Sequence, residues 1–199
     1  MPGKLAPNHA SNDAMLRDGF AFAAERPALD LAATLKGRLK PATLETLNEP
    51  ADLSRWLRAA RLTDGTPPVG AADLELARAL RESIYAVAMA RIAGDKPPLH
   101  ARRALNRVAA GRESVPQLDA QGRARSLGTV HGLLVVLARQ AVQLLGGPEG
   151  ARLRQCEGEM CARLFVDDSR AGDRRWCSMA SCGNRAKVAQ FRRRQRLAR

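Results

Sequence analysis

The sequence predicts a mainly α-helical protein in two parts: an N-terminal helical domain and a small cysteine-rich module that ends in a basic helix. Hydrophobic residues make up 45% of the 199 residues but aromatic residues only 4%. The core must therefore be built from Leu, Val, Ile and Ala, which favours helices over a β-sandwich. All four cysteines lie between residues 156 and 182. We expect a loose tail over 1–19, the helical domain over 20–150 and the module over 151–199.

Apolar residues at three- and four-residue steps predict the helices of the first domain. The clearest is 71–93, where Leu80, Ile84 and Val87 recur at this spacing and Gly94 is placed to end the helix. Pro50 is suited to the first turn of another, which carries Trp56. The expected helices are 26–39, 48–62, 71–93, 97–111 and 129–147, with a short hairpin within 115–127.

The charge of the chain indicates an anionic partner. The formal net charge is +13, and 28 of the 33 basic residues are Arg, whose planar guanidinium binds phosphate through two contacts. The longest apolar run, 132–138, is too short to span a bilayer. The first residues lack the continuous apolar stretch of a secretion signal. We therefore expect a cytoplasmic protein that does not interact with membranes.

The cysteines form two pairs of identical spacing, C-x4-C, separated by 15 residues. Two close pairs of thiolates can supply the four corners of a tetrahedral zinc site, and four cysteines leave no open position for a substrate. The spacing therefore favours one structural Zn²⁺ held by Cys156, Cys161, Cys177 and Cys182. An iron–sulfur cluster and two disulfides are the alternatives. A redox pair usually has C-x-x-C spacing.

The order of elements in the module indicates a treble-clef-like zinc finger. A turn carries the first cysteine pair, 163–170 is expected as a strand and turn, and a helix begins at Cys182. The module is too small to have a core without the metal, so its fold should depend on zinc. We expect its few large apolar side chains to pack together: Leu164, Phe165, Trp176, Val188 and Phe191.

The stretch 152–194 resembles the CGNR zinc finger. The resemblance covers both cysteine pairs, "LFVDDSR", "RRWCSM" and the tetrapeptide Cys182–Arg185 that gives the family its name. Members of that family usually carry an N-terminal ABATE domain, described as a candidate stress-induced transcription regulator. The segments "ALDLAATLKGR", "ADLSRWLRAARL" and "LRESIYAVAMARIAG" are similar to that domain. The resemblance implies a zinc-binding, DNA-binding regulator.

One position departs from the family pattern. The opening motif of the ABATE domain usually reads Leu-Asp-x-x-Asn-Thr, whereas Ala33 stands here in place of the Asn. Any function of that amide in a ligand pocket is therefore lost or changed in this chain. The candidate pocket residues are Asp30, Thr34 and His131.

The end of the chain is the predicted nucleic-acid-binding segment. Residues 183–199 contain seven basic residues and no acidic one. On a helix Arg185, Arg192 and Arg196 share one face, from which they could bind phosphates or guanine edges. RNA binding and a protein-interaction module are the alternatives. The candidate contacts are Arg174, Arg175, Arg185, Lys187, Arg192, Arg193, Arg194 and Arg196.

No arrangement of residues indicates catalysis. The chain has no glycine-rich phosphate loop and no recognisable pairing of a nucleophile with a base. We therefore expect a protein that is not an enzyme. A small molecule or a partner protein could act as a signal at the helical domain.

Overall fold

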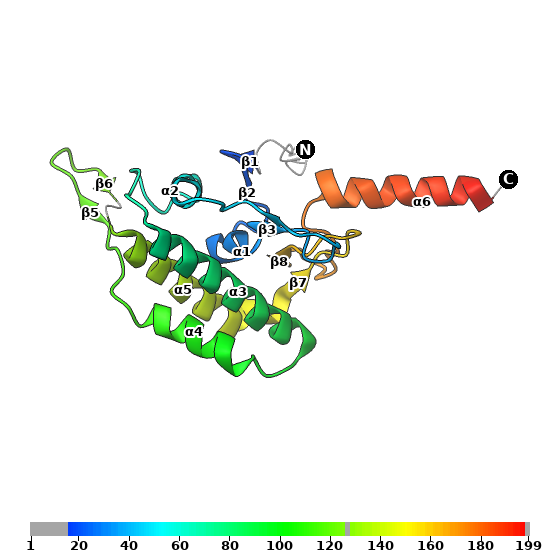
Figure 1. Ribbon diagram of the computed structural model, residues 1–199. Coiled ribbons are helices and arrows are strands. Elements are labelled where there is room, and N and C mark those ends of the chain that lie inside the picture. The colour runs from blue at the N-terminus through cyan, green and yellow to red at the C-terminus, as the bar shows by residue number, and fades with distance from the viewer. Residues whose placement is uncertain (1–15, 126–127, 198–199) are drawn as a thin grey trace, which may run out of the picture.

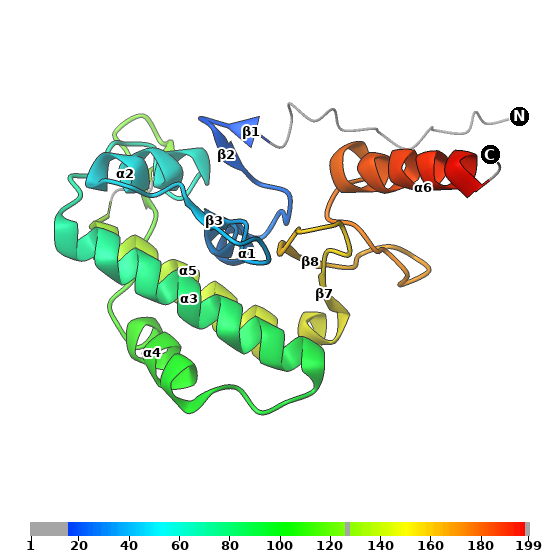
Figure 2. The same ribbon diagram turned by 45° about the vertical axis from the view of Figure 1, so that its right-hand side comes forward.

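The computed structural model describes residues 16–125 and 128–197. Its centre is a layer of three helices in which α3 and α5 lie side by side and α4 packs against both, while α1 and α2 lie on the other side of α3 (Figures 1 and 2). The mainly α-helical prediction is confirmed. The α-helices are α1 (Pro27–Ala32), α2 (Pro50–Ala59), α3 (Ala71–Ala93), α4 (Leu99–Ala109), α5 (Val130–Gly146) and α6 (Asn184–Leu197).

Helix α3 follows the sequence pattern closely. Its buried positions include Leu80, Ile84 and Ala88, which face the common core. Gly94 ends the helix at φ 77°, in the left-handed region that glycine adopts without strain. Helix α5 begins at Thr129, whose side chain accepts a hydrogen bond from the backbone N–H of Gly132.

Helix α1 is much shorter than the predicted helix over 26–39, and that boundary was wrong. After Ala33 the chain turns into β3 (Leu35–Lys36), which pairs antiparallel with β4 (Leu44–Glu45). The hydroxyl of Thr34 donates to the carbonyl of Leu31, and the hydroxyl of Thr46 donates to the carbonyl of Thr34. The side chains of these threonines thus satisfy backbone groups that a longer helix would have paired.

Helix α2 is anchored at both its start and its buried face. The Asp52 carboxylate accepts hydrogen bonds from the backbone N–H groups of Asn48 and Glu49, which closes the first turn. Trp56 is fully buried and stacks with Phe22, their ring centroids 6.0 Å apart. Phe22 follows a two-stranded hairpin, β1 (Leu16–Arg17) with β2 (Phe20–Ala21).

Two further hairpins complete the fold. The predicted hairpin within 115–127 is confirmed: β5 (Gln117–Leu118) pairs with β6 (Ala124–Arg125). The 3-10 turn η2 (Pro148–Arg152) then leads from α5 into β7 (Leu153–Gln155), which pairs antiparallel with β8 (Leu164–Val166). Of the predicted tail over 1–19, residues 1–15 lie outside the described part of the chain.

The β7–β8 hairpin belongs to two cores at once. Because side chains alternate across a strand, Leu164 and Val166 join Leu153 in the core of the helical domain. Phe165 points to the opposite side, where it packs with the cysteines. The cysteine module is therefore packed against the helical domain and is not an independent unit joined only by a linker. The same hairpin completes both hydrophobic cores.

Helix α6 projects from the body of the molecule (Figures 1 and 2). None of its 14 residues is buried, and 42% of Val188 and 61% of Phe191 are exposed. Leu164 was also expected in the module core but lies in that of the helical domain. The expectation that Val188 and Phe191 pack in the module was wrong as well. The helix turns them outward, so the small core consists of the cysteines, Phe165 and Trp176.

No helix among residues 16–125 and 128–197 has both the length and the apolar character needed to cross a membrane.

Candidate metal centre and basic helix

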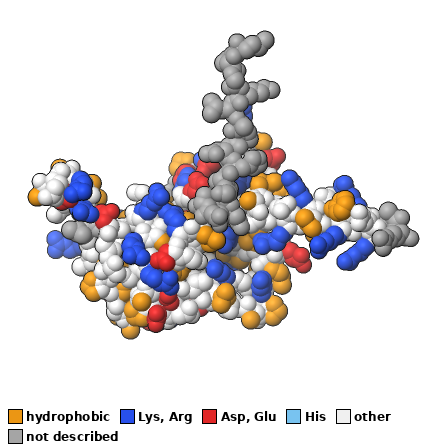
Figure 3. Space-filling model, turned by 90° about the horizontal axis from the view of Figure 1, so that it is seen from above, with side chains coloured by type: hydrophobic (Ala, Val, Ile, Leu, Met, Phe, Trp, Pro, Cys, Tyr) orange, Lys and Arg blue, Asp and Glu red, His pale blue; other side chains and the backbone are white. Residues whose placement is uncertain are grey.

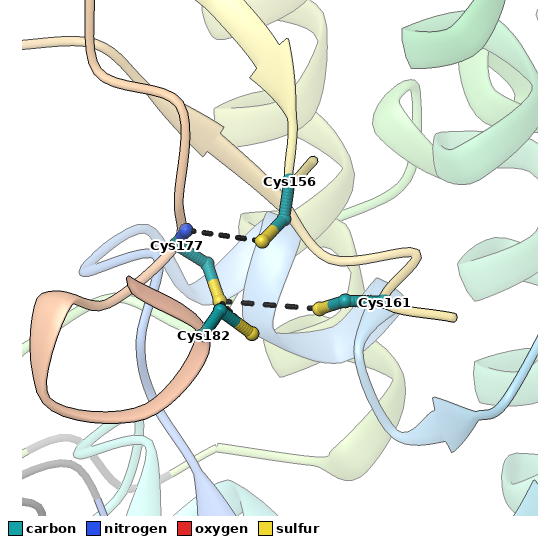
Figure 4. A group of neighbouring side chains, drawn as sticks. All are labelled: Cys156, Cys161, Cys177 and Cys182. Carbon is teal, nitrogen blue, oxygen red and sulfur yellow. Dashed lines mark hydrogen bonds between the residues drawn. The ribbon is translucent and has the colours of Figure 1, made fainter. Parts of the chain in front are cut away.

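Four cysteines from separate turns converge on one point. Cys156 follows β7 and Cys161 closes the next turn. Cys177 precedes the helical turn η3 (Met179–Gly183) that leads into α6, and Cys182 lies within that turn. Their sulfur atoms all lie within 4.8 Å of one another and face a common centre (Figure 4). The Sγ–Sγ distance is 4.0 Å between Cys161 and Cys177, and 3.8 Å between Cys177 and Cys182.

These distances fit a tetrahedral zinc ion. Four thiolates at the usual zinc–sulfur bond length lie about 3.8 Å from one another. With four cysteine ligands the tetrahedral coordination is complete, so no open position on the metal is left for a substrate. The residues form a site for one structural Zn²⁺.

The acid–base chemistry of the cluster also calls for a cation. Hydrogen bonding to Cys156 raises the pKa of Cys161 to about 11, and the pKa of Cys177 is raised for the same reason. One thiolate in so small a space therefore opposes the ionisation of its neighbours. A divalent cation removes this opposition and holds all four sulfurs as thiolates.

Hydrogen-bond donors surround the sulfurs. The backbone N–H groups of Cys177 and Gly158 donate to Cys156 Sγ over 3.3 and 3.4 Å. The guanidinium of Arg185 donates to Cys182 Sγ over 3.0 Å. Zinc with four thiolates carries a formal charge of −2, so these donors stabilise the site. A Cβ atom at Gly158 would lie only 2.9 Å from Cys182 Sγ, so this position has no space for a side chain.

The loop between β8 and Cys177 is held by its own polar contacts. The Asp167 carboxylate accepts hydrogen bonds from the hydroxyl of Ser169 and from the backbone N–H of Arg174. The Arg174 guanidinium donates to the carbonyls of Trp176 and Cys177 and lies over the ring of Phe165, 4.5 Å from its centroid. This arrangement delivers Cys177 to the metal site.

The eight predicted nucleic-acid contacts fall into two groups. Arg174, Arg175 and Arg185 have partners inside the finger: Arg175 forms an ion pair with Glu157 over 2.6 Å, and the other two make the contacts described above. The remaining five extend along the exposed helix α6: Lys187, Arg192, Arg193, Arg194 and Arg196. Figure 3 shows basic side chains on both flanks of this helix.

The three predicted pocket residues do not form one pocket. Asp30 and Thr34 are almost fully buried, at 2% and 3% exposure, whereas His131 is exposed rather than in the core. Asp30 accepts a hydrogen bond from the backbone N–H of Ala24 over 3.0 Å. Burial raises the pKa of Asp30 to about 7. Thr34 is also held by Arg81, which donates to its hydroxyl over 3.3 Å.

The structure instead places a cavity of about 800 Å³ between the helical domain and the finger. Ala33, at the position of the family asparagine, lies on its wall. Three basic residues that sequence reasoning missed also line it, because no local pattern marks them: Lys36, Lys40 and Arg163. The finger contributes two of the zinc ligands and the first turns of α6 to the same wall. A molecule in this cavity would touch both parts of the protein.

Polar contacts also tie the finger to the helical domain. Arg26 forms ion pairs with Glu149 over 2.9 Å and with Asp168 over 3.3 Å. The side-chain amide of Gln155 donates to the hydroxyl of Tyr85 over 3.2 Å. Together with the shared hairpin, these contacts fix the position of the finger on the helical domain.

Comparison with known proteins agrees with this architecture. The ABATE family model, described as "Putative stress-induced transcription regulator", matches residues 25–148, which is more than half of the chain. The CGNR zinc finger model matches residues 152–195. Both resemblances noted in the sequence are thereby confirmed. A search among curated proteins finds no match to the chain.

Proposed function

Because this chain belongs to the ABATE family and carries a CGNR zinc finger, we propose that it is a zinc-dependent, DNA-binding transcription regulator. One observation carries the proposal. A helix of 14 residues without a buried side chain is joined directly to the metal site and carries Lys187 and five exposed arginines, of which only Arg185 binds a cysteine sulfur. A helix with this charge and no buried residue is suited to a polyanion.

The zinc site fixes the position of the N-terminal end of this helix. Cys182 lies in the turn that runs into α6, and Arg185 in the first turn of the helix binds the same sulfur. A bound zinc ion therefore holds the start of α6 in place relative to the helical domain. In this proposal the protein has no catalytic activity and acts in the cytoplasm, where thiolates stay reduced.

We assign the signal-receiving role to the cavity beside Ala33. A small molecule there would contact α1 and β3 on one side and the finger on the other. Its binding energy could then change how α6 is presented to DNA. A response to stress, which the family description suggests, would act through this route.

The test is fluorescence anisotropy of a labelled random-sequence duplex titrated with the zinc-loaded, full-length protein. The variant with Arg192, Arg194 and Arg196 replaced by Ala should bind at least tenfold more weakly at moderate salt, since each phosphate contact contributes to affinity. The matched control replaces three exposed arginines of α4 instead: Arg102, Arg103 and Arg107. Equal losses in both variants would reduce α6 to a general source of charge and contradict the proposal.

The exposure of Phe191 favours one second candidate, binding of single-stranded RNA, because exposed aromatic side chains stack on unpaired bases. Unlabelled single-stranded RNA in the same assay separates the two. If RNA displaces the duplex at a lower concentration than unlabelled duplex does, RNA is the preferred ligand.

A further inference from the structure

The side chains of α6 form stripes of different character along the helix. Successive residues turn by about 100°, so Asn184, Val188, Phe191 and Gln195 fall on one stripe. Arg192 and Arg196 flank this stripe on one side, and Lys187 and Arg194 flank it on the other. An apolar and amide stripe thus runs between two rows of positive charge.

This stripe faces away from the body of the protein. Ala186 and Ala189 lie on the opposite side of the helix and line the cavity between the finger and the helical domain. Asn184, Val188, Phe191 and Gln195 are all exposed. With only two apolar side chains, the stripe is too small to anchor the helix in a lipid surface or a hydrophobic protein groove. The charge on both flanks points to an occupant that carries negative charge on both sides of the helix.

Duplex DNA has this form. Its major groove is about 12 Å wide, admits an α-helix and is bordered on each side by a row of phosphates. Building on the proposed function, we infer that α6 lies in the major groove with Asn184, Val188, Phe191 and Gln195 toward the base edges. The two basic flanks then reach the phosphates of the two strands.

The side chains of the stripe predict which base pairs it contacts. Apolar side chains in the major groove contact the methyl group of thymine, and the amides of Asn and Gln pair with the N6 and N7 atoms of adenine. None of these four side chains suits guanine, the usual partner of arginine. The preferred site therefore contains A·T base pairs at the centre of the contact. Arg193 lies opposite the stripe and makes no base contact.

The test begins with selection of duplexes from a random pool by the zinc-loaded, full-length protein. Each thymine of the selected site is then replaced by uracil, which removes only the methyl group. At one or more positions this should weaken binding by about fivefold, within the discrimination typical of one base contact. The same replacement should have no effect on the Phe191→Ala or Val188→Ala variant. These exposed positions tolerate alanine, and zinc content verifies that each variant is folded.

The matched controls are Leu197→Ala, which removes another exposed apolar residue of α6 outside the stripe, and Arg193→Ala. Both should keep the full response to uracil. Failure to bind any duplex would overturn both the proposed function and this inference. Binding without sequence enrichment, enrichment of sites without thymine, or equal affinity for thymine and uracil would overturn this inference alone and leave α6 as a phosphate-binding helix.

Discussion

Arg185 donates a hydrogen bond to the Sγ atom of Cys182 over 3.0 Å, from the first turn of α6 to the last ligand of the metal site. The thiolate in turn raises the pKa of the Arg185 guanidinium, through the hydrogen bond and the attraction between the charges. The residue predicted as a DNA contact thus has a partner inside the finger. It connects the zinc site to the helix that the site positions.

Replacement of Arg185 by Ala should weaken zinc binding by about tenfold, because loss of a donor around a metal site typically costs 10–100-fold in affinity. Competition with a chromophoric chelator measures this directly. Arg193→Ala removes the same charge from the same helix without touching a sulfur and should leave the affinity unchanged. Equal zinc affinity in the two variants would show that the hydrogen bond does not stabilise the site.

Removal of zinc should destabilise the helical domain as well as the finger. Leu153, Leu164 and Val166 lie in the core of the helical domain but are held by the hairpin that leads to the cysteines. In a Trp176→Phe background, the fluorescence of buried Trp56 reports on the helical core alone. Chelation should lower its thermal midpoint by about 5 °C or more. An unchanged midpoint would mean that the hairpin keeps its place without the metal.

The stability of the protein should depend on the ionisation of Asp30. In the unfolded chain this carboxyl ionises near pH 4, whereas burial raises its folded pKa to about 7. Between these values the folded state holds a proton that the unfolded state has lost, so this contribution to stability falls as the pH rises from about 4 to 7. The nearby guanidinium groups of Arg17 and Arg163 limit the shift.

Replacement of Asp30 by Asn should remove this dependence and raise the free energy of unfolding above pH 7, on the order of 2–4 kcal/mol. Urea unfolding of the wild-type and Asp30→Asn proteins at pH 5.5 to 8 gives the difference between their free energies of unfolding. The effect of pH on the zinc thiolates is the same in both proteins and cancels in this difference. Parallel stability curves would contradict the prediction.

Arg81 should be essential for the fold of the segment around β4. Only 4% of its side chain is exposed, and its guanidinium donates to the two oxygens of Glu45 over 2.7 and 2.8 Å. Arg81→Ala removes two charged hydrogen bonds from Glu45, whose side chain is 25% exposed, and should cost about 2 kcal/mol of unfolding free energy. Arg123→Ala, which breaks an exposed pair with Asp119, should cost less than about 1 kcal/mol. Urea unfolding of both variants tests the contrast.

The sequence by itself determined the parts of this protein that depend on local spacing. The three- and four-residue period of Leu80 and Ile84 specified α3, and Gly94 specified its end, because both depend only on neighbouring residues. The two C-x4-C pairs specified the zinc site, because zinc requires four ligands at a fixed geometry.

Only the tertiary structure decided how these parts combine. Helix α1 ends at Ala32 because of contacts with the β3–β4 hairpin, which no helical period reveals. Phe191 is exposed because α6 leaves the body of the molecule, although its sequence also allowed packing against the finger. The two-sided packing of β7–β8 and the cavity beside Ala33 join residues more than 100 positions apart. Such contacts depend on the path of the whole chain and not on the preference of any single segment.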